Sequence, residues 1–245
     1  MDNPYLSVII PAYNEEKRIL KTLERITEYL AAQSYAWEIL VVIDGAHDAT
    51  ASIVSEYIKR NPKVRLIDRK KNKGKGYTVR EGILAVTGTI RLFADADNST
   101  DIGHFDKMKP LFDSGYDIVI ASRDEKDVVG ATQAVSQPPL KRLLGNLGNL
   151  FIQVVAVRGI WDTQCGFKAC TAGAAQKIFS VAVIDRWGFD IEMLALARHF
   201  GFKIGIIPAH WINDAESHVT LGGYIKVLFE TVEIRWNFIT GRYGK

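Results

Sequence analysis

The sequence has few cysteines and no long apolar run, and both absences narrow its class. Two cysteines, Cys165 and Cys170, occur in 245 residues, too few for a disulfide framework or a thiolate metal site, so we expect them buried in a reducing cytosol. The most apolar stretch, residues 147–157, is shorter than the roughly 18 residues of a membrane span. The first residues lack both a basic and an apolar segment, so we expect no secretory signal.

An excess of charge of one sign is also missing. The net charge is +3, which is too small to indicate a nucleic-acid partner. Basic residues gather only in residues 69–75, and we expect that run to face phosphate or solvent. The composition, 47% hydrophobic and 24% charged, is that of a globular protein that can bury a core without disulfides or structural metals.

Apolar runs alternate with amphipathic helical patterns through the first half of the chain. The runs are nearly all apolar, as in strands that are buried on both faces. Strands that alternate with helices are typical of a parallel sheet covered by helices on both faces. We therefore predict an α/β fold with a Rossmann-like, mostly parallel sheet. The expected strands are residues 5–12, 37–43, 64–67, 90–94 and 117–121.

The second half is less regular. Residues 124–139 mix charge, glycine, glutamine and a proline pair, and a loop of that length is usually functional or disordered, so we expect it to be mobile. We expect helices over residues 140–157 and near 171–179, another helix that opens with residues 187–192, and a late strand over 204–210.

The tail, residues 221–243, has the pattern of an amphipathic helix. One face carries six apolar residues, and charged side chains lie elsewhere on the helix. We favour packing of this face on the domain's own core. The alternative is an interfacial helix that lies on a membrane or a partner. The six residues are Ile225, Leu228, Phe229, Val232, Trp236 and Ile239.

Two carboxylates one residue apart, Asp95 and Asp97, follow the apolar run 90–94. Ligands of parallel α/β sheets bind where strands end, so these side chains belong at the lip of a cleft. Carboxylate oxygens there suit Mg²⁺ or Mn²⁺, which complete their shells with waters and phosphate oxygens. An isolated Asp-x-Asp is more often a helix-capping turn, so the rest of the chain decides between the two.

Polar residues at other strand ends favour the metal site. Pro11, Tyr13 and Glu15 follow the first strand and Asp44 ends the second, so a base and ribose can lie across them. Lys75 stands between two glycines at a helix start, where an anion can approach. Each residue has a structural alternative, but four successive polar strand ends argue against coincidence.

At this point the sequence resembles the family 2 glycosyltransferases of GT-A fold. In the second half, residues 162–168 and 187–192 look like the dolichyl-phosphate β-glucosyltransferase branch, which is close to the dolichyl-phosphate mannose synthases. The motifs that carry the wider resemblance are residues 7–16, 42–45 with Asp48 and Thr50, 72–76, and 95–97.

The resemblance implies roles for individual residues. Pro11, Tyr13, Glu15 and Asp44 would hold the nucleoside, and Lys75 would lie near the nucleotide. Asp95 and Asp97 would bind donor and metal, with Asp97 the metal residue that serves the reaction.

For the acceptor, Arg123 and Arg142 match positions that grip phosphate, although a salt bridge is the structural alternative for Arg123. Asp190 or Glu192 would instead act as base if the acceptor were a hydroxyl, and helix capping with an ion pair is the alternative for both. Histidines 104, 199, 210 and 218 are third metal ligands only in principle.

The resemblance also implies a reaction and a place. It implies inverting, metal-dependent transfer of a hexose to a polyprenyl or dolichyl phosphate, with UDP-glucose the first choice of donor and GDP-mannose the second. We expect a cytoplasmic enzyme at the membrane surface. Alternatives are a hydroxyl-acceptor transferase, a nucleotidyltransferase and a non-catalytic nucleotide-sugar-binding module.

The implied domain is residues 1–220, followed by the helix of 221–245. Its nucleotide-binding half is 1–123, and after the 124–139 loop comes an acceptor half, 140–220. The oligomeric state is left open.

Overall fold

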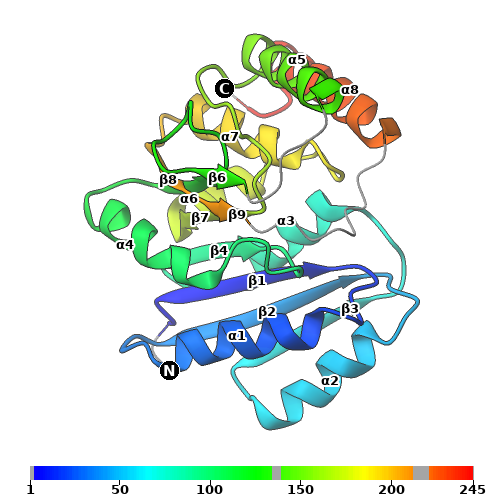
Figure 1. Ribbon diagram of the computed structural model, residues 1–245, viewed down its shortest axis with the longest axis vertical. Coiled ribbons are helices and arrows are strands. Elements are labelled where there is room, and N and C mark those ends of the chain that lie inside the picture. Colours follow the sequence, from blue (N-terminus) through cyan, green and yellow to red (C-terminus); the bar gives the residue numbers. More distant parts are fainter. Residues whose placement is uncertain (1–2, 134–138, 212–220, 245) are drawn as a thin grey trace.

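The computed structural model describes residues 3–133, 139–211 and 221–244, and a seven-stranded sheet forms its centre (Figure 1). The strand order is β3-β2-β1-β4-β7-β5-β8, and every neighbouring pair is parallel except the two that involve β7. The predicted α/β fold with a mostly parallel sheet is confirmed. The strands are β1 (Leu6–Ala12), β2 (Trp37–Asp44), β3 (Val64–Arg69), β4 (Ile90–Ala94), β5 (Ile118–Ser122), β7 (Phe167–Thr171) and β8 (Ile204–Pro208).

Helices cover both faces of this sheet, as predicted. One buried core lies under α1, α2 and α4, and a second lies under the helices of the opposite face. The apolar spacing of α1 shows why the first face forms, because Ile19, Leu23, Ile26 and Leu30 fall on one side of the helix and are all buried. The helices of this face are α1 (Ile19–Ala31), α2 (Thr50–Arg60) and α4 (Phe105–Asp113), which follows the short η1 (Ile102–His104).

The opposite face is deeper, because a second tier of helices covers the first (Figure 1). α3 packs on β1 and β2, while α5 and α8 contact each other at the outside of the molecule. No helix in the described ranges is long and apolar enough to cross a membrane. The helices of this face are α3 (Lys75–Ala85), α5 (Pro139–Val155), α6 (Ala172–Phe179), α7 (Phe189–His199) and α8 (Leu221–Ile239).

β7 is not among the predicted strands, and it runs antiparallel between β4 and β5. Its register pairs Ala94 with Phe167 and Ile120 with Lys168. Because β7 runs against its neighbours, it begins at the edge where they end. The residues just before β7 therefore lie beside the carboxyl ends of β4 and β5.

The expectation for α8 is wrong about which face is buried. Ile225, Phe229 and Trp236, on the face expected to pack on the core, are 50%, 73% and 62% exposed. The helix packs through other residues, among them Val227 and Ile234, which belong to the second core. α8 is thus joined to the domain by one side and leaves its more apolar side in solvent.

The expected mobile loop begins with a defined path. Asp127 Oδ2 accepts from Ser122 Oγ at 2.7 Å and from the Asp162 amide at 2.8 Å, so this stretch is tied to the sheet edge. The short strand β6 (Thr132–Gln133) then pairs in parallel with β9 (His210–Trp211). The remainder of the expected loop, residues 134–138, lies outside the described residues.

Candidate active site

The strand ends converge on one edge of the sheet, as the sequence indicates. β1, β2, β4 and β5 run in one direction, so residues that follow them share an edge. The start of β7 joins this edge from the other direction. The Asp95 amide donates to the Gly166 carbonyl at 3.1 Å, which holds the chain after β4 against the chain before β7.

Gly166 is the residue that lets the Asp95 carboxylate lie where it does. A Cβ on Gly166 would stand 1.9 Å from Asp95 Oδ2, far inside van der Waals contact. On its other side, Asp95 Oδ1 lies 2.5 Å from the Lys75 ammonium. The Asp95 side chain keeps 32% of its surface exposed, so it is held by two neighbours and still open to a ligand.

Asp97 lies on the turn that follows β4. Its Oδ1 accepts from the Ser99 amide at 2.9 Å, and Asn98 between them has a φ of 54°, a left-handed conformation that asparagine tolerates. Thr22 from α1 donates to the Ala96 carbonyl at 2.6 Å and fixes the backbone between the two aspartates. In the described part of the chain, Asp97 Oδ2 has no hydrogen-bond partner.

Asp95 and Asp97 would offer a metal carboxylate oxygens alone, and few of them. Within the described ranges, no group of three or more His, Cys, Asp or Glu side chains is arranged to hold a metal. His104 is committed to the Asp101 carbonyl and the His210 amide, and His199 packs on Phe200. His218 lies outside the described residues. A pair of carboxylates that leaves most positions to waters and phosphate fits Mg²⁺ or Mn²⁺ and not zinc.

Lys75 reaches Asp95, but the reason given for its flanking glycines needs correction. A Cβ on Gly74 would lie 2.3 Å from the Asp185 carbonyl, and one on Gly76 would lie 2.5 Å from the Ile184 carbonyl. The glycines therefore make room for residues 184–186 and not for an anion. That segment also takes the first amides of α3, since the amides of Gly76 and Tyr77 donate to its carbonyls.

The Lys75 ammonium places a positive charge beside the Asp95 carboxylate. Burial lowers the pKa of Lys75, but the nearby Asp95 and Asp190 carboxylates outweigh it and raise that pKa above its usual range. Lys75 therefore stays charged, and any cation held by Asp95 must share the carboxylate with it.

Asp44 is buried, and its carboxylate points into the following loop. Oδ1 accepts from the Lys73 amide at 2.7 Å and Oδ2 from the Gly74 amide at 2.8 Å, and the Arg69 guanidinium adds a contact of 3.0 Å. Asp44 thus fixes the loop that leads to Lys75.

The residues after β1 lie beside this loop in different states of exposure. Pro11 is buried in β1 beyond Ile9, where the pairing with β4 ends, so its missing amide donor breaks no bond of that ladder. Tyr13 is 43% exposed. The Glu15 carboxylate pairs with Arg18 at 2.7 Å, and the Glu15 amide donates to Thr50 Oγ1. Tyr13 is therefore the most open of the four expected nucleoside contacts.

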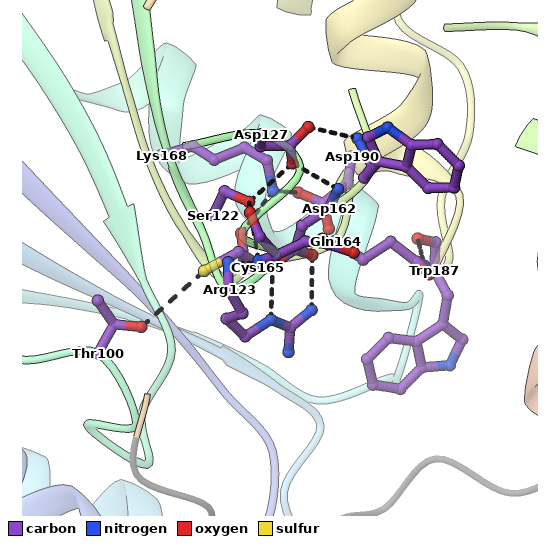
Figure 2. Close-up of polar contacts among 12 residues, drawn as sticks. Thr100, Ser122, Arg123, Asp127, Asp162, Gln164, Cys165, Lys168, Trp187 and Asp190 are labelled. Carbon is purple, nitrogen blue, oxygen red and sulfur yellow. Dashed lines mark hydrogen bonds and ion pairs between the residues drawn. The ribbon is translucent and has the colours of Figure 1, made fainter. Parts of the chain in front are cut away.

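Arg123 forms a two-pronged ion pair that Figure 2 shows at the centre of the site. Its Nε and Nη2 lie 2.7 Å from the two oxygens of Asp162, and its amide donates to Asp162 as well. Burial raises the pKa of Asp162, but Arg123 outweighs it and holds that pKa below the usual range. The salt bridge considered for Arg123 exists, and its partner is Asp162. Arg142 lies on α5, and its side chain is outside the described residues.

Lys168 and Asp190 form a second ion pair, deeper than the first (Figure 2). The Lys168 ammonium is fully buried and lies 2.6 Å from Asp190 Oδ1, which is itself 5% exposed on its side chain. Burial raises the pKa of Asp190 while Lys168 and Lys75 act against that rise. The ion pair expected as an alternative for Asp190 is therefore present.

Glu192 points away from Asp190 into the second core. It accepts from the amides of Val183 and Ile184 and from the Tyr243 hydroxyl, at 2.9, 3.0 and 2.6 Å. With three donors and no exposed surface, it holds structure together and cannot serve as a base.

Gly166, Lys168, Asp162 and Asp127 are site residues to which the sequence analysis gave no role. Three of them lie in residues 162–168, a segment that carries the family resemblance. The resemblance marks this segment but does not predict the contacts of its residues. A lysine inside an apolar run was the available signal for Lys168, because a buried ammonium requires a carboxylate partner.

The sequence profile of glycosyl transferase family 2 matches residues 7–179, which include all but the first residue of β1, the strands from β2 to β7, and the strand ends that form the edge. The chain belongs to glycosyltransferase family 2. This family 2 enzyme is 36% identical, over 97% of its length and 72% of the relative's, to a dolichyl-phosphate beta-glucosyltransferase of Trichomonas vaginalis. It is 32% identical to the Homo sapiens dolichyl-phosphate beta-glucosyltransferase, over 97% of its length and 77% of the relative's.

Solved structures agree on the fold. The glycosyltransferase superposes on glucosyl-3-phosphoglycerate synthase from Mycobacterium tuberculosis, solved with uridine diphosphate, with a TM-score of 0.69 and 17% identity over 95% of this chain and 80% of that one. For mannosyl-3-phosphoglycerate synthase from Rubrobacter xylanophilus the TM-score is 0.71, with 15% identity over 98% and 75% of the two chains. These similarities confirm the expected GT-A architecture.

Replacing Gly166 by alanine tests how closely Asp95 depends on β7. We expect the new methyl group to expel the Asp95 carboxylate and to lower transferase activity by about two orders of magnitude, in the range seen when one electrostatic contact of an active site is lost. The thermal midpoint should fall by only a few degrees, because Asp95 can rotate toward solvent. Gly173→Ala is the matched control, since a Cβ at Gly173 meets nothing within 4 Å. Full activity in Gly166→Ala would contradict the assigned position of Asp95.

Proposed function

We propose that this protein transfers glucose from UDP-glucose to a polyprenyl or dolichyl phosphate, with inversion at the anomeric carbon. The observation that carries the proposal is its 36% identity, over 97% of the chain, to a dolichyl-phosphate beta-glucosyltransferase. Another relative of that name, from Dictyostelium discoideum, is 33% identical over 98% of the chain. The matched length includes the sheet edge, the segment before β7 and α7, so similarity extends to both sides of the site.

The two aspartates are the residues that we propose hold Mg²⁺ or Mn²⁺. Structural neighbours were solved with Mn²⁺ together with uridine diphosphate, and the carboxylate pair here fits the same class of ion. When bound, such an ion would neutralise charge on the departing nucleotide diphosphate. Asp97 has the unengaged oxygen, so we assign it the principal role, with Asp95 shared between donor, metal and Lys75.

We propose nucleoside contacts from the loops after β1 and β2. Tyr13 is exposed enough to lie against the base, while Pro11 and Glu15 shape the loop that holds Tyr13. Asp44 contributes through the loop that it fixes, which carries Lys75 toward the diphosphate.

A phosphate acceptor suits this site better than a hydroxyl. A phosphate oxygen is already anionic at neutral pH, so it needs orientation and no strong base. Asp190 is engaged by Lys168, and Glu192 by three donors, so neither is free to remove a hydroxyl proton. We propose that Arg123, through the Nη1 left by its pair with Asp162, and Arg142 orient the acceptor phosphate.

A polyprenyl phosphate resides in a membrane, so we place the enzyme at the cytoplasmic face, where a nucleotide-sugar is available. Two alternative functions would give different results in a transfer assay. A hydroxyl-acceptor transferase would use UDP-glucose without a lipid phosphate, and a binding module would turn over no donor.

The test is transfer of radiolabelled sugar to a short polyprenyl phosphate in the presence of Mn²⁺, with UDP-glucose and GDP-mannose compared at equal concentration. We expect a lipid-linked product from UDP-glucose that disappears on chelation of the metal. Product from GDP-mannose alone would move the assignment to mannose. Transfer only to a sugar hydroxyl would overturn the lipid-phosphate acceptor.

A further inference from the structure

The exposed side of α8 is a continuous apolar stripe. Its members recur at spacings of four and three residues, which places them on one face of the helix. Each keeps half or more of its surface exposed, and none has a partner among the described residues that covers it. The stripe consists of Ile225 (50%), Phe229 (73%), Val232 (50%), Trp236 (62%) and Ile239 (65%).

Exposed apolar side chains gather on this end of the described molecule. Of the thirteen exposed large hydrophobic residues in the described part of the chain, nine lie on α8 and on the adjoining α5, and only Tyr13, Leu20, Leu84 and Val129 lie elsewhere. Large exposed apolar areas of this kind mark interaction sites. Figure 1 shows these two helices side by side at the end of the molecule farthest from α2.

Positive charge borders the stripe. At about 100° per residue along a helix, Lys226 falls on one border of the stripe, together with Glu233, and Arg235 falls on the other, and all three are exposed. Arg242 follows the helix and is exposed too, against the single exposed acid Glu233 on described α8. Basic residues beside an apolar face, with a tryptophan in it, are the composition of helices that lie in a lipid interface.

We infer that α8 docks flat on an anionic lipid surface through this stripe. The inference rests on the proposed function, because a polyprenyl-phosphate acceptor requires a lipid surface next to the site. Two copies of this chain fit the stripe less well, since a two-fold interface would bring the same basic borders together.

The buried side of α8 connects the stripe to the active site. Glu230 Oε2 accepts from the Gly188 amide at 2.6 Å, and the Tyr243 hydroxyl after the helix donates to Glu192 on α7. Trp187, next to Gly188, lies with its ring centre 5.7 Å from the Lys75 ammonium. These contacts fix α8 with its stripe outward, so a lipid-docked helix holds a wall of the site at the membrane surface.

The test is co-sedimentation of the full chain with vesicles of phosphatidylcholine and about one-third phosphatidylglycerol, without donor. We expect the double variant Phe229→Glu/Trp236→Glu to bind at least about tenfold more weakly than the wild type. Leu20→Glu/Leu84→Glu, two exposed leucines outside the stripe, is the matched control and should bind like the wild type. Equal binding of the stripe variant and the wild type would overturn the proposal.

Two further readouts separate this proposal from its neighbours. With a short water-soluble acceptor, the stripe variant should keep wild-type activity within about twofold, because the site is untouched. Vesicle binding without any glucosyl transfer would support the docking surface and contradict the proposed function. A wild-type dimer that the stripe variant converts to a monomer, with no vesicle binding in either, would show that a second copy covers α8 and would overturn the lipid assignment.

Discussion

Replacing Asp97 by alanine is expected to lower kcat/KM for glucosyl transfer by about two to three orders of magnitude, the range associated with loss of one preorganised electrostatic contact to a transition state. The physical reason is the shortage of oxygen ligands. We assign the metal to two carboxylates, Asp95 and Asp97, and Asp95 already shares one oxygen with Lys75. Without Asp97, too few protein ligands remain to hold a divalent ion.

The measurement is initial-rate kinetics at several Mn²⁺ concentrations. If Asp97 acts on the metal, high Mn²⁺ should recover part of the lost rate in Asp97→Asn and none in Asp97→Ala. Asp113→Ala, at the far end of α4, is the control and should be indistinguishable from the wild type. An Asp97→Ala enzyme with more than a tenth of the wild-type rate would show that the metal is held elsewhere.

Lys168→Met is expected to have the largest effect on stability, about 3 to 5 kcal/mol of the free energy of unfolding. The substitution removes the ammonium from a pair in which both side chains are almost completely buried. Asp190 would then be an uncompensated carboxylate at the sheet edge, and the Cys165 carbonyl would lose its donor as well. Equilibrium denaturation in urea measures the loss, and Lys21→Met, exposed on α1, should change little.

Two further measurements separate the pair from simple packing. Lys168→Met/Asp190→Leu should be more stable than Lys168→Met alone, because it removes the unpaired charge. Burial already raises the pKa of Asp190, so the folded variant takes up a proton more readily than the unfolded chain. The stability of Lys168→Met should therefore increase as the pH falls toward the acid range. A loss that is the same at every pH would indicate that the ion pair is not its cause.

The sequence predicted the strands that carry their own signal. β1, β2 and β4 are nearly all apolar runs with polar ends, so their positions and the shared edge followed from periodicity and from the geometry of parallel sheets. β7 has five residues with Lys168 among them, and nothing in its pattern indicates that it runs between β4 and β5. Its place between β4 and β5 is set by tertiary packing, and the Asp95–Gly166 contact depends on that place.

The error about α8 has a similar origin. The pattern predicted the helix correctly but assigned its apolar face to the core. Polar residues occupy the buried side instead: Thr231 donates to the Val227 carbonyl, and Asn237 donates to the Tyr243 hydroxyl. These partners come from the fold, so hydropathy alone ranked those positions as exposed.

The glycines around Lys75 illustrate a third limit. Their presence predicted a close approach, and a close approach exists, but the approaching group is the chain at residues 184–186. A sequence shows that space is needed at a position and does not show what fills it. Asp44 is comparable, because its oxygens hold the neighbouring loop.

The measurement that tests the central claim most directly is proton NMR of the product formed from UDP-glucose and a short polyprenyl phosphate. A single in-line displacement by the acceptor phosphate on the α-linked donor predicts a β-glucosyl phosphate, recognised by the large coupling of its anomeric proton. An α-glucosyl product, or free glucose with the lipid phosphate unchanged, would contradict inverting transfer at this site.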